Sequence, residues 1–241
     1  MFNMQMSYNT PTTAIIVAGG TGTRMGGEKP KQFFLLNGKP VLGHTLESFL
    51  RSYDEMEIIL VLPEAHLEEG MKIAREFGEG RKIIPATGGA TRWESVRNGL
   101  AKVQHKGIVL VHDGVRCLVQ PTLIQRCCEQ ALLKGSAVPV VPATDSIRVV
   151  DGESSRVADR DSIRLVQTPQ TFQVVPLRDA FSQCNRNDFT DEATVWEASG
   201  RQVDLIQGDY DNIKITRPVD LLIAGAILER RSALEPSKRQ G

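Results

Sequence analysis

The 241-residue sequence has few features of a secreted, membrane-bound or metal-binding protein. It has only four cysteines, Cys117, Cys127, Cys128 and Cys184, which form no Cys-x-x-Cys pair, and its four histidines lack a zinc-type spacing. These thiols are therefore expected to be structural, in a reducing compartment. No apolar run reaches the roughly 20 residues that span a bilayer. The first residues also lack the basic and apolar regions of a signal peptide. The expected location is the cytoplasm.

An excess of charge of one sign is also absent. Lys+Arg and Asp+Glu both number 29, so no net positive field attracts nucleic acid. A binding site for a polyanion must therefore be a local pocket. The length and the apolar fraction of 41% are ordinary for a single globular domain.

Strand-like and helix-like patterns alternate along the first 142 residues. Short runs rich in Val and Ile predict strands at 13–17, 58–62, 82–85, 108–112 and 137–141. Helical patterns lie between them: one follows Pro40, one begins at a capping box formed by Thr91 and Glu94, and one covers 123–133. This alternation predicts an α/β fold with a Rossmann-like sheet, mixed but mostly parallel, and helices on both faces.

The alternation stops after Pro142. Residues 145–150 and 164–166 look like strands, but 151–162 is polar and loop-like, and no helix separates them. We expect a protruding β-arm at about 143–166, covered by a second subunit because exposed strand edges need cover. The rest of the single domain, about 13–142 and 167–233, forms the core. It includes a short helix at 191–198 capped by Thr190, a strand at 202–206 and a last helix at 218–231.

A glycine-rich loop follows the first predicted strand. Five glycines between positions 19 and 27 lie beside Arg24, Lys29 and Lys31. Glycine lets backbone N–H groups approach an anion, and the cations add full charge. The loop is not a P-loop, because Glu28 stands where that motif needs lysine, and Met25 breaks the dinucleotide fingerprint. A phosphate-binding turn is favoured, and a flexible surface loop is the alternative.

Two further loops are expected at the same edge of the sheet, because ligands bind beyond the carboxyl ends of parallel strands. The loop at 88–92 enters a helix N-terminus, which favours a phosphate or a base carbonyl, although a simple capped turn has the same pattern. Asp113 ends the fourth strand, where its carboxylate suits ribose hydroxyls or magnesium, or merely caps a turn. Arg116 suits an anionic second substrate or a surface salt bridge.

A polar loop just before the last helix holds Lys214 between Ile213 and Ile215. The β-branched neighbours would hold this lysine stiffly. A fixed ammonium group suits negative charge that develops at phosphorus, whereas an ordinary surface lysine is the alternative.

Taken together, the motifs resemble the 2-C-methyl-D-erythritol 4-phosphate cytidylyltransferase family of the sugar nucleotidyltransferase superfamily. In chain order they are AGGTGTRM at 18–25, PKQ at 30–32, GGATRWES at 88–95, VHDGVR at 111–116, DS at 145–146, QTPQ at 167–170, TDE at 190–192 and DNIKIT at 211–216. The first motif is typical of the whole superfamily. The 167–170 and 211–216 segments narrow the resemblance to this family and to its close relative, ribitol-5-phosphate cytidylyltransferase.

The resemblance implies a magnesium-dependent transfer of CMP from CTP to methylerythritol phosphate, releasing pyrophosphate, in non-mevalonate isoprenoid synthesis. It implies charge stabilisation of the α-phosphate by Arg24, Lys31 and Lys214. Nucleotide binding would fall to Ala18, Gly19, Gly20, Gly22, Thr23, Gly89, Arg92, Ser95, Asp113 and Gly114, with Asp113 as the candidate metal ligand. The polyol phosphate would contact Arg116, Ser146, Arg160, Thr168 and Thr190.

The resemblance also implies a homodimer in which Arg160 reaches from the arm into the neighbouring active site. Cys117 departs from the family pattern, which usually has proline there, so a looser turn is expected after Arg116. Three other functions are alternatives: cytidylyl transfer to ribitol 5-phosphate, nucleotide sensing without catalysis, and nicotinamide-dependent oxidoreduction. The cations at positions 24, 31 and 214 argue against the second, and Met25 argues against the third.

Overall fold

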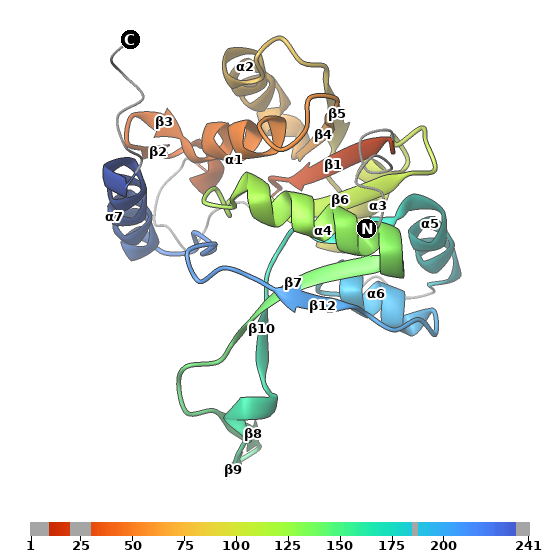
Figure 1. Cartoon of the computed structure of the whole chain (residues 1–241), viewed down its shortest axis with the longest axis vertical. Coiled ribbons are helices and arrows are strands. Elements are labelled where there is room, and N and C mark those ends of the chain that lie inside the picture. Colours follow the sequence, from red (N-terminus) through yellow and green to blue (C-terminus); the bar gives the residue numbers. More distant parts are fainter. Residues whose placement is uncertain (1–9, 20–29, 185–187, 235–241) are drawn as a thin grey trace, which may run out of the picture.

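The protein is built around a mixed, mostly parallel sheet in a computed structural model that describes residues 10–19, 30–184 and 188–234 (Figure 1). The sheet order is β10-β7-β11-β6-β1-β4-β5, with β12 also paired to β7. The strands are β1 (Thr12–Val17), β4 (Glu57–Leu62), β5 (Ile83–Thr87), β6 (Ile108–Asp113), β7 (Ser136–Pro142), β10 (Arg164–Val166), β11 (Gln170–Gln173) and β12 (Leu205–Gln207). The predicted fold class is confirmed.

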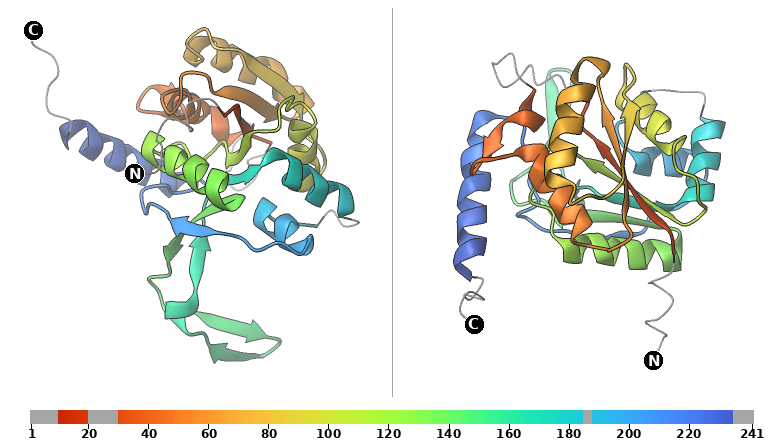
Figure 2. Two further views of the ribbon diagram at one scale, coloured as in Figure 1. Left: turned by 45° about the vertical axis from the view of Figure 1, so that its right-hand side comes forward. Right: turned by 90° about the horizontal axis from the view of Figure 1, so that it is seen from above.

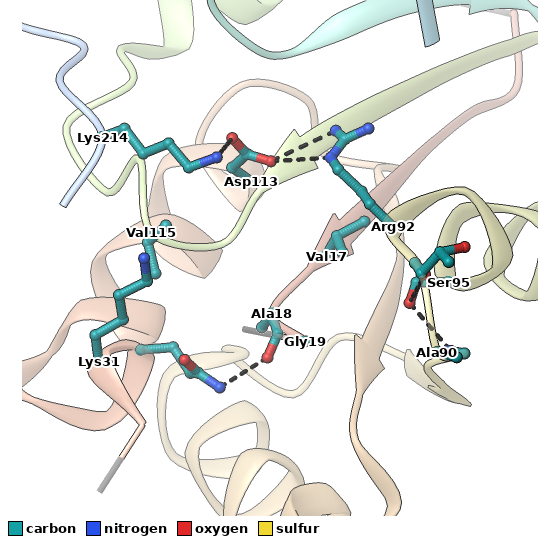
Figure 3. Close-up of a pocket in the computed structure, with 13 residues that line it drawn as sticks. Val17, Ala18, Gly19, Lys31, Ala90, Arg92, Ser95, Asp113, Val115 and Lys214 are labelled. Carbon is teal, nitrogen blue, oxygen red and sulfur yellow. Dashed lines mark hydrogen bonds and ion pairs between the residues drawn. The ribbon is translucent and has the colours of Figure 1, made fainter. Parts of the chain in front are cut away.

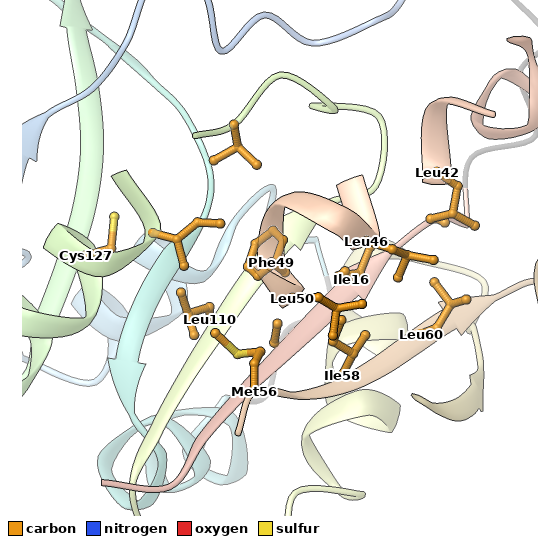
Figure 4. Close-up of a cluster of buried hydrophobic side chains, with 14 of the residues drawn as sticks. Ile16, Leu42, Leu46, Phe49, Leu50, Met56, Ile58, Leu60, Leu110 and Cys127 are labelled. Atoms are coloured by element: carbon orange, nitrogen blue, oxygen red, sulfur yellow. The ribbon is translucent and has the colours of Figure 1, made fainter. Parts of the chain in front are cut away.

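The central strands are buried on both faces, which explains their nearly continuous apolar sequence. Ala14 and Ile16 of β1 face one core cluster, whereas Ile15 faces the other. Strands β4 and β6 alternate in the same way, because successive side chains point to opposite faces of a sheet. Figure 4 shows the first cluster, in which Phe49 and Leu46 pack over Ile16 and Leu110.

Helices cover both faces of the sheet (Figure 2). Helices α1 (Val41–Leu50), α2 (Leu67–Phe77) and α4 (Pro121–Lys134) pack on the first cluster. On the second cluster lie α3 (Arg92–Leu100), α5 (Val174–Gln183) and α6 (Glu192–Ala198). A third cluster joins α7 (Pro218–Leu234) to a small hairpin of β2 (Leu35–Leu36) and β3 (Lys39–Pro40). None of the helices in the described ranges is long and apolar enough to cross a membrane.

An arm projects from the sheet, as the sequence predicts, but its strands differ from those expected (Figures 1 and 2). The strand predicted at 164–166 is present as β10, but it pairs with β7 rather than with the strand predicted at 145–150. The tip is a separate hairpin of β8 (Arg148–Asp151) and β9 (Ser154–Val157). The prediction of a loop at 151–162 was therefore wrong at 154–157. This segment, Ser-Ser-Arg-Val, has little apolar alternation, yet it pairs with β8. The turn between the two strands contains Gly152, whose φ is +56°.

Two further boundaries differ from the sequence prediction. The cap of α6 is Asp191 and not Thr190, because the Asp191 carboxylate accepts a hydrogen bond from the Thr194 N–H at 2.9 Å. The strand predicted at 202–206 begins only at Leu205. The four cysteines are free thiols, and three of them are buried, in agreement with the structural role expected for them.

Two helical glycines give a matched test of this packing. A Cβ at Gly99 in α3 would lie 2.7 Å from Ile15 Cγ2 of β1, whereas at Gly225 in α7 the nearest atom would be 3.6 Å away. We expect Gly99→Ala to lower the free energy of unfolding by about 1–2 kcal/mol through overpacking. Gly225→Ala should raise it by up to about 1 kcal/mol through helix propensity. Urea denaturation measures both, and equal signs would contradict the close packing of α3.

Candidate functional site

A cavity of about 260 Å³ opens at the carboxyl edge of β1, β5 and β6 (Figure 3). Strands that run parallel bring their following loops to one edge, so segments distant in sequence meet there. The figure shows Lys31 and Lys214 on one side of the pocket and Ser95 on the other. Of the residues expected from the sequence, those that line the cavity are Ala18, Gly19, Lys31, Gly89, Arg92, Ser95, Asp113 and Lys214.

The Asp113 carboxylate at the end of β6 is the electrostatic centre of this site. Its Oδ2 lies 2.8 Å from Lys214 Nζ and 3.6 Å from Arg116 Nε, and its Oδ1 lies 3.4 Å from Arg92 Nη2. Burial alone would raise the pKa of Asp113. The positive charges, Arg92 first, outweigh burial and hold that pKa far below its ordinary value. The group is therefore a carboxylate at neutral pH.

Arg92 is held from two directions at the first position of α3. Its Nη1 donates to Glu192 Oε1 of α6, and Nε and Nη2 face Asp113. The Glu192 carboxyl is buried, and burial raises its pKa although the adjacent Arg92 charge opposes that shift. The guanidinium plane is thus fixed beside the pocket by two acidic groups on different elements.

The turn before α3 is closed by hydrogen bonds from its own side chains to its backbone N–H groups. The capping box is confirmed: Thr91 Oγ1 accepts from the Glu94 N–H, and Glu94 Oε2 accepts from the N–H groups of Ala90 and Thr91. Ser95 Oγ accepts from the Gly89 N–H at 3.0 Å. A Cβ at Gly89 would lie 2.3 Å from Glu94 Cβ, so the turn requires glycine. The dipole of α3 favours an anion near this turn.

Lys31 begins a short 3₁₀ helix, Lys31–Phe33, directly after the glycine-rich loop. Its neighbour Gln32 is fully buried and donates from Nε2 to the Ala18 carbonyl at 2.7 Å. This bond ties the beginning and end of the loop together. Lys31 is thereby placed at the pocket wall.

The loop that carries Lys214 is anchored on both sides of the lysine. Ile215 is fully buried in the third cluster, and its N–H donates to the Val115 carbonyl at 3.0 Å. Asn212, also buried, donates from Nδ2 to the Thr168 carbonyl at 2.8 Å. These contacts hold Lys214 beside Asp113, as the stiff β-branched segment predicts.

Other expected site residues lie behind the pocket wall. The Arg116 guanidinium donates to the carbonyls of Asn212 and Val166, and the Thr168 hydroxyl contacts the Asp113 N–H and the His112 ring. A Cβ at Gly114 would lie 3.0 Å from Ala18 Cβ. Cys117 is buried, and the turn after Arg116 is closed by a bond from the Val119 N–H to the Arg116 carbonyl.

Three expected residues are not brought to the pocket. Ser146 and Arg160 are exposed on the arm, where Arg160 Nη1 donates to the Thr144 carbonyl, and Thr190 is exposed before α6. Within one chain these residues do not line the cavity. Gly20, Gly22, Thr23 and Arg24 lie outside the described residues.

Asp113 does not fit the role of magnesium ligand that the sequence suggested. Its two oxygens already face three cationic groups, so the local charge is positive and would repel a divalent ion. No cluster of three His, Cys, Asp or Glu residues able to hold a metal ion occurs in the described parts of the chain.

Sequence reasoning missed two of the supporting residues. Gln32 and Glu192 each stand in a quoted motif without an assigned role, and Glu192 meets Arg92 across 100 residues of chain. The spacing contains no signal for the second contact, because only the packing of α6 beside α3 creates it.

The described side chains that line the pocket include three cationic groups, Lys31, Arg92 and Lys214. Such groups suit transfer between phosphates, in which positioning and charge neutralisation supply most of the catalysis. The fold and the site together define a nucleotidyltransferase of the sugar-nucleotide type.

The comparisons with known proteins narrow this class. The family model for 2-C-methyl-D-erythritol 4-phosphate cytidylyltransferase matches residues 12–230. The enzyme of that name from Bacteroides fragilis is 45% identical over 216 residues, which is 90% of this chain and 99% of the relative. The crystal structure of the Thermus thermophilus enzyme of the same name matches with a TM-score of 0.73 at 32% sequence identity. The match covers 91% of this chain and 99% of the Thermus chain.

The chain belongs to the 2-C-methyl-D-erythritol 4-phosphate cytidylyltransferase family. Its reaction is the CTP-dependent cytidylylation of 2-C-methyl-D-erythritol 4-phosphate (methylerythritol phosphate) in the non-mevalonate isoprenoid pathway.

Asp113→Asn tests the electrostatic centre through stability. At neutral pH the variant should unfold about 3 kcal/mol more easily, because buried cations lose their counter-charge. The lowered pKa of Asp113 means that its stabilisation is fully present above the unfolded value of about 3.9 and is lost progressively as pH falls from there towards the much lower folded pKa. Between about pH 7 and about pH 3, urea denaturation should therefore show the difference in unfolding free energy between the two proteins narrow by about 1 kcal/mol. A gap that stays constant with pH would contradict the ion pairs.

Proposed function

We propose that Lys31 and Lys214 are the principal catalytic residues of the described site, together with Arg24 from the adjacent loop. Lys31 and Lys214 come from opposite ends of the chain and line the same pocket. Their shared position is the observation that carries the proposal. The ammonium groups would stabilise charge on the α-phosphate of CTP.

The chemistry needs no protein nucleophile. An oxygen of the methylerythritol phosphate monoester attacks the α-phosphorus, forms a new P–O bond and displaces pyrophosphate, which takes the electron pair of the broken bond. Because two anions must approach each other, the main barrier is repulsion. Fixed cations lower it by holding the reactants in line and offsetting the added charge.

The nucleotide would enter between the α3 N-terminus and the two lysines. Residues of the 89–95 turn and Ala18–Gly19 line the pocket and would contact CTP, while the dipole of α3 and the Arg92 guanidinium favour its negative charge. Lys214 pairs with Asp113 and its side chain is 42% exposed, so its Nζ can reach an incoming phosphate without leaving a buried position. Asp113 then still has Arg92 and Arg116 as partners.

Magnesium would arrive with the triphosphate, which supplies oxygen ligands of its own, and would add positive charge between the phosphates. The residues present support only this indirect binding, as the surroundings of Asp113 indicate.

The acceptor side of the site would require a second copy of the chain. Arg116 and Thr168 lie beside the pocket, whereas Ser146 and Arg160 are on the arm. The arm carries exposed apolar side chains, including Val150 and Val157, which a partner subunit would cover. We therefore propose a homodimer with shared active sites. The free thiols favour a cytoplasmic location.

Removing either lysine tests the catalytic role. Lys31→Ala and Lys214→Ala should each lower kcat by about 10²–10³, because the charge acts mainly in the transition state. The melting temperature should change little, and Lys102→Ala, an exposed lysine outside the pocket, serves as the control. Pyrophosphate release from CTP measures the rate with methylerythritol phosphate and, separately, with ribitol 5-phosphate. A fully active lysine variant would contradict the role, and faster turnover of ribitol 5-phosphate would overturn the acceptor.

Mixing inactive variants tests the shared site. If Arg160 acts in the neighbouring subunit, a heterodimer of Arg160→Ala and Lys214→Ala chains contains one intact site and one doubly altered site. Random exchange of subunits should then restore about a quarter of the wild-type activity, since half of the dimers are mixed and each has one working site. If Arg160 acts within its own chain, mixing restores nothing.

A further inference from the structure

His112 is a buried polar residue to which the reaction described above assigns no role. It precedes Asp113 on β6, is 0% exposed, and lies against the Phe49 ring at a centroid distance of 4.9 Å. A histidine so placed could simply fill the core. Its hydrogen bonds, however, lead directly to the pocket.

Both ring nitrogens of His112 have a partner. Nε2 lies 3.1 Å from the Arg116 carbonyl oxygen, and Nδ1 lies 2.9 Å from Thr168 Oγ1. Thr168 Oγ1 is in turn 3.1 Å from the Asp113 N–H. These three bonds link the end of β6, the turn after it and the segment before β11.

The partners fix which ring nitrogen carries the proton. A carbonyl oxygen accepts only, so Nε2 must carry a proton and donate to Arg116. Burial lowers the pKa of His112 to about 3, so the ring is neutral near pH 7 and Nδ1 carries no proton. Nδ1 then accepts from the Thr168 hydroxyl, whose oxygen can still accept from the Asp113 N–H.

The groups that His112 holds in place also position Lys214, one of the proposed catalytic residues. The Asp113 carboxylate pairs with Lys214, and the Thr168 carbonyl accepts from Asn212 in the loop that carries Lys214. We infer that His112 is a positioning residue, whose ring fixes the Thr168 hydroxyl and the turn that carries Asp113. It acts on Lys214 only through these neighbours.

Two conservative variants test the hydrogen bonds of the two ring nitrogens separately. The amide oxygen of His112→Asn lies near the position of Nδ1 and can still accept from Thr168. The amide nitrogen of His112→Gln lies near Nε2 and can still donate to the Arg116 carbonyl. We expect His112→Gln to lower kcat for cytidylyl transfer by about 10–100-fold, because the Thr168 branch is lost and small displacements of reacting groups are costly. His112→Asn should retain most of the wild-type kcat.

A double-mutant cycle shows whether the effect travels through Thr168. In the Thr168→Val background, His112→Gln should cause no further loss of kcat, since the bond between them is already gone. An equal loss in both backgrounds would overturn the inference. The core change Ile58→Val, which leaves the three bonds intact, controls for lowered stability and should leave kcat per folded molecule unchanged.

Nitrogen NMR of the wild-type protein tests the ring itself if a variant fails to fold. The spectrum should show His112 protonated at Nε2 alone, unchanged from about pH 6 to about pH 8. Protonation at Nδ1, or titration in that range, would overturn the inference. Because His112 acts through residues whose roles are proposed above, the two proposals must be separable. Full kcat in His112→Gln would refute only the positioning role, whereas full activity in Lys31→Ala or Lys214→Ala would refute the proposed catalysis.

Discussion

The site depends on one buried negative charge, the Asp113 carboxylate. Arg92, Arg116 and Lys214 are far apart in the sequence and all face this carboxylate. Without its negative charge, the three cations would repel one another. The carboxylate makes their approach favourable and remains ionised because they surround it. The protein thus gathers positive charge at the place where two phosphates must meet.

The fold supplies the geometry for this assembly. Strands β1, β5 and β6 run parallel and deliver Ala18, Gly89 and Asp113 to one edge. Strand β11 runs antiparallel to β6, which brings the segment before it, with Thr168, to that same edge. Buried amides then fix the loops: Gln32 holds the Ala18 carbonyl, and Asn212 holds the Thr168 carbonyl.

Much of this arrangement could be predicted from sequence where local chemistry decides the structure. The apolar runs of β1, β4 and β6, the capping box at Thr91 and the anchored segment around Lys214 all carry their signal within a few residues. The β8–β9 hairpin was missed because Ser154–Val157 has too little apolar alternation to mark a strand. The Arg92–Glu192 pair was missed because tertiary packing alone joins α3 to α6. The family resemblance named the site residues and assigned Arg160 to the arm, but it did not distinguish the residues that line the pocket from Gly114, Arg116 and Thr168 behind its wall.

A crystal structure with CTP and magnesium bound tests the central claim most directly. The account predicts that the Nζ atoms of Lys31 and Lys214 both lie within about 3.2 Å of α-phosphate oxygens. It also predicts that Asp113 remains paired with Arg92 and does not ligate the metal. A triphosphate bound away from both lysines, or a magnesium ion coordinated by Asp113, would contradict it.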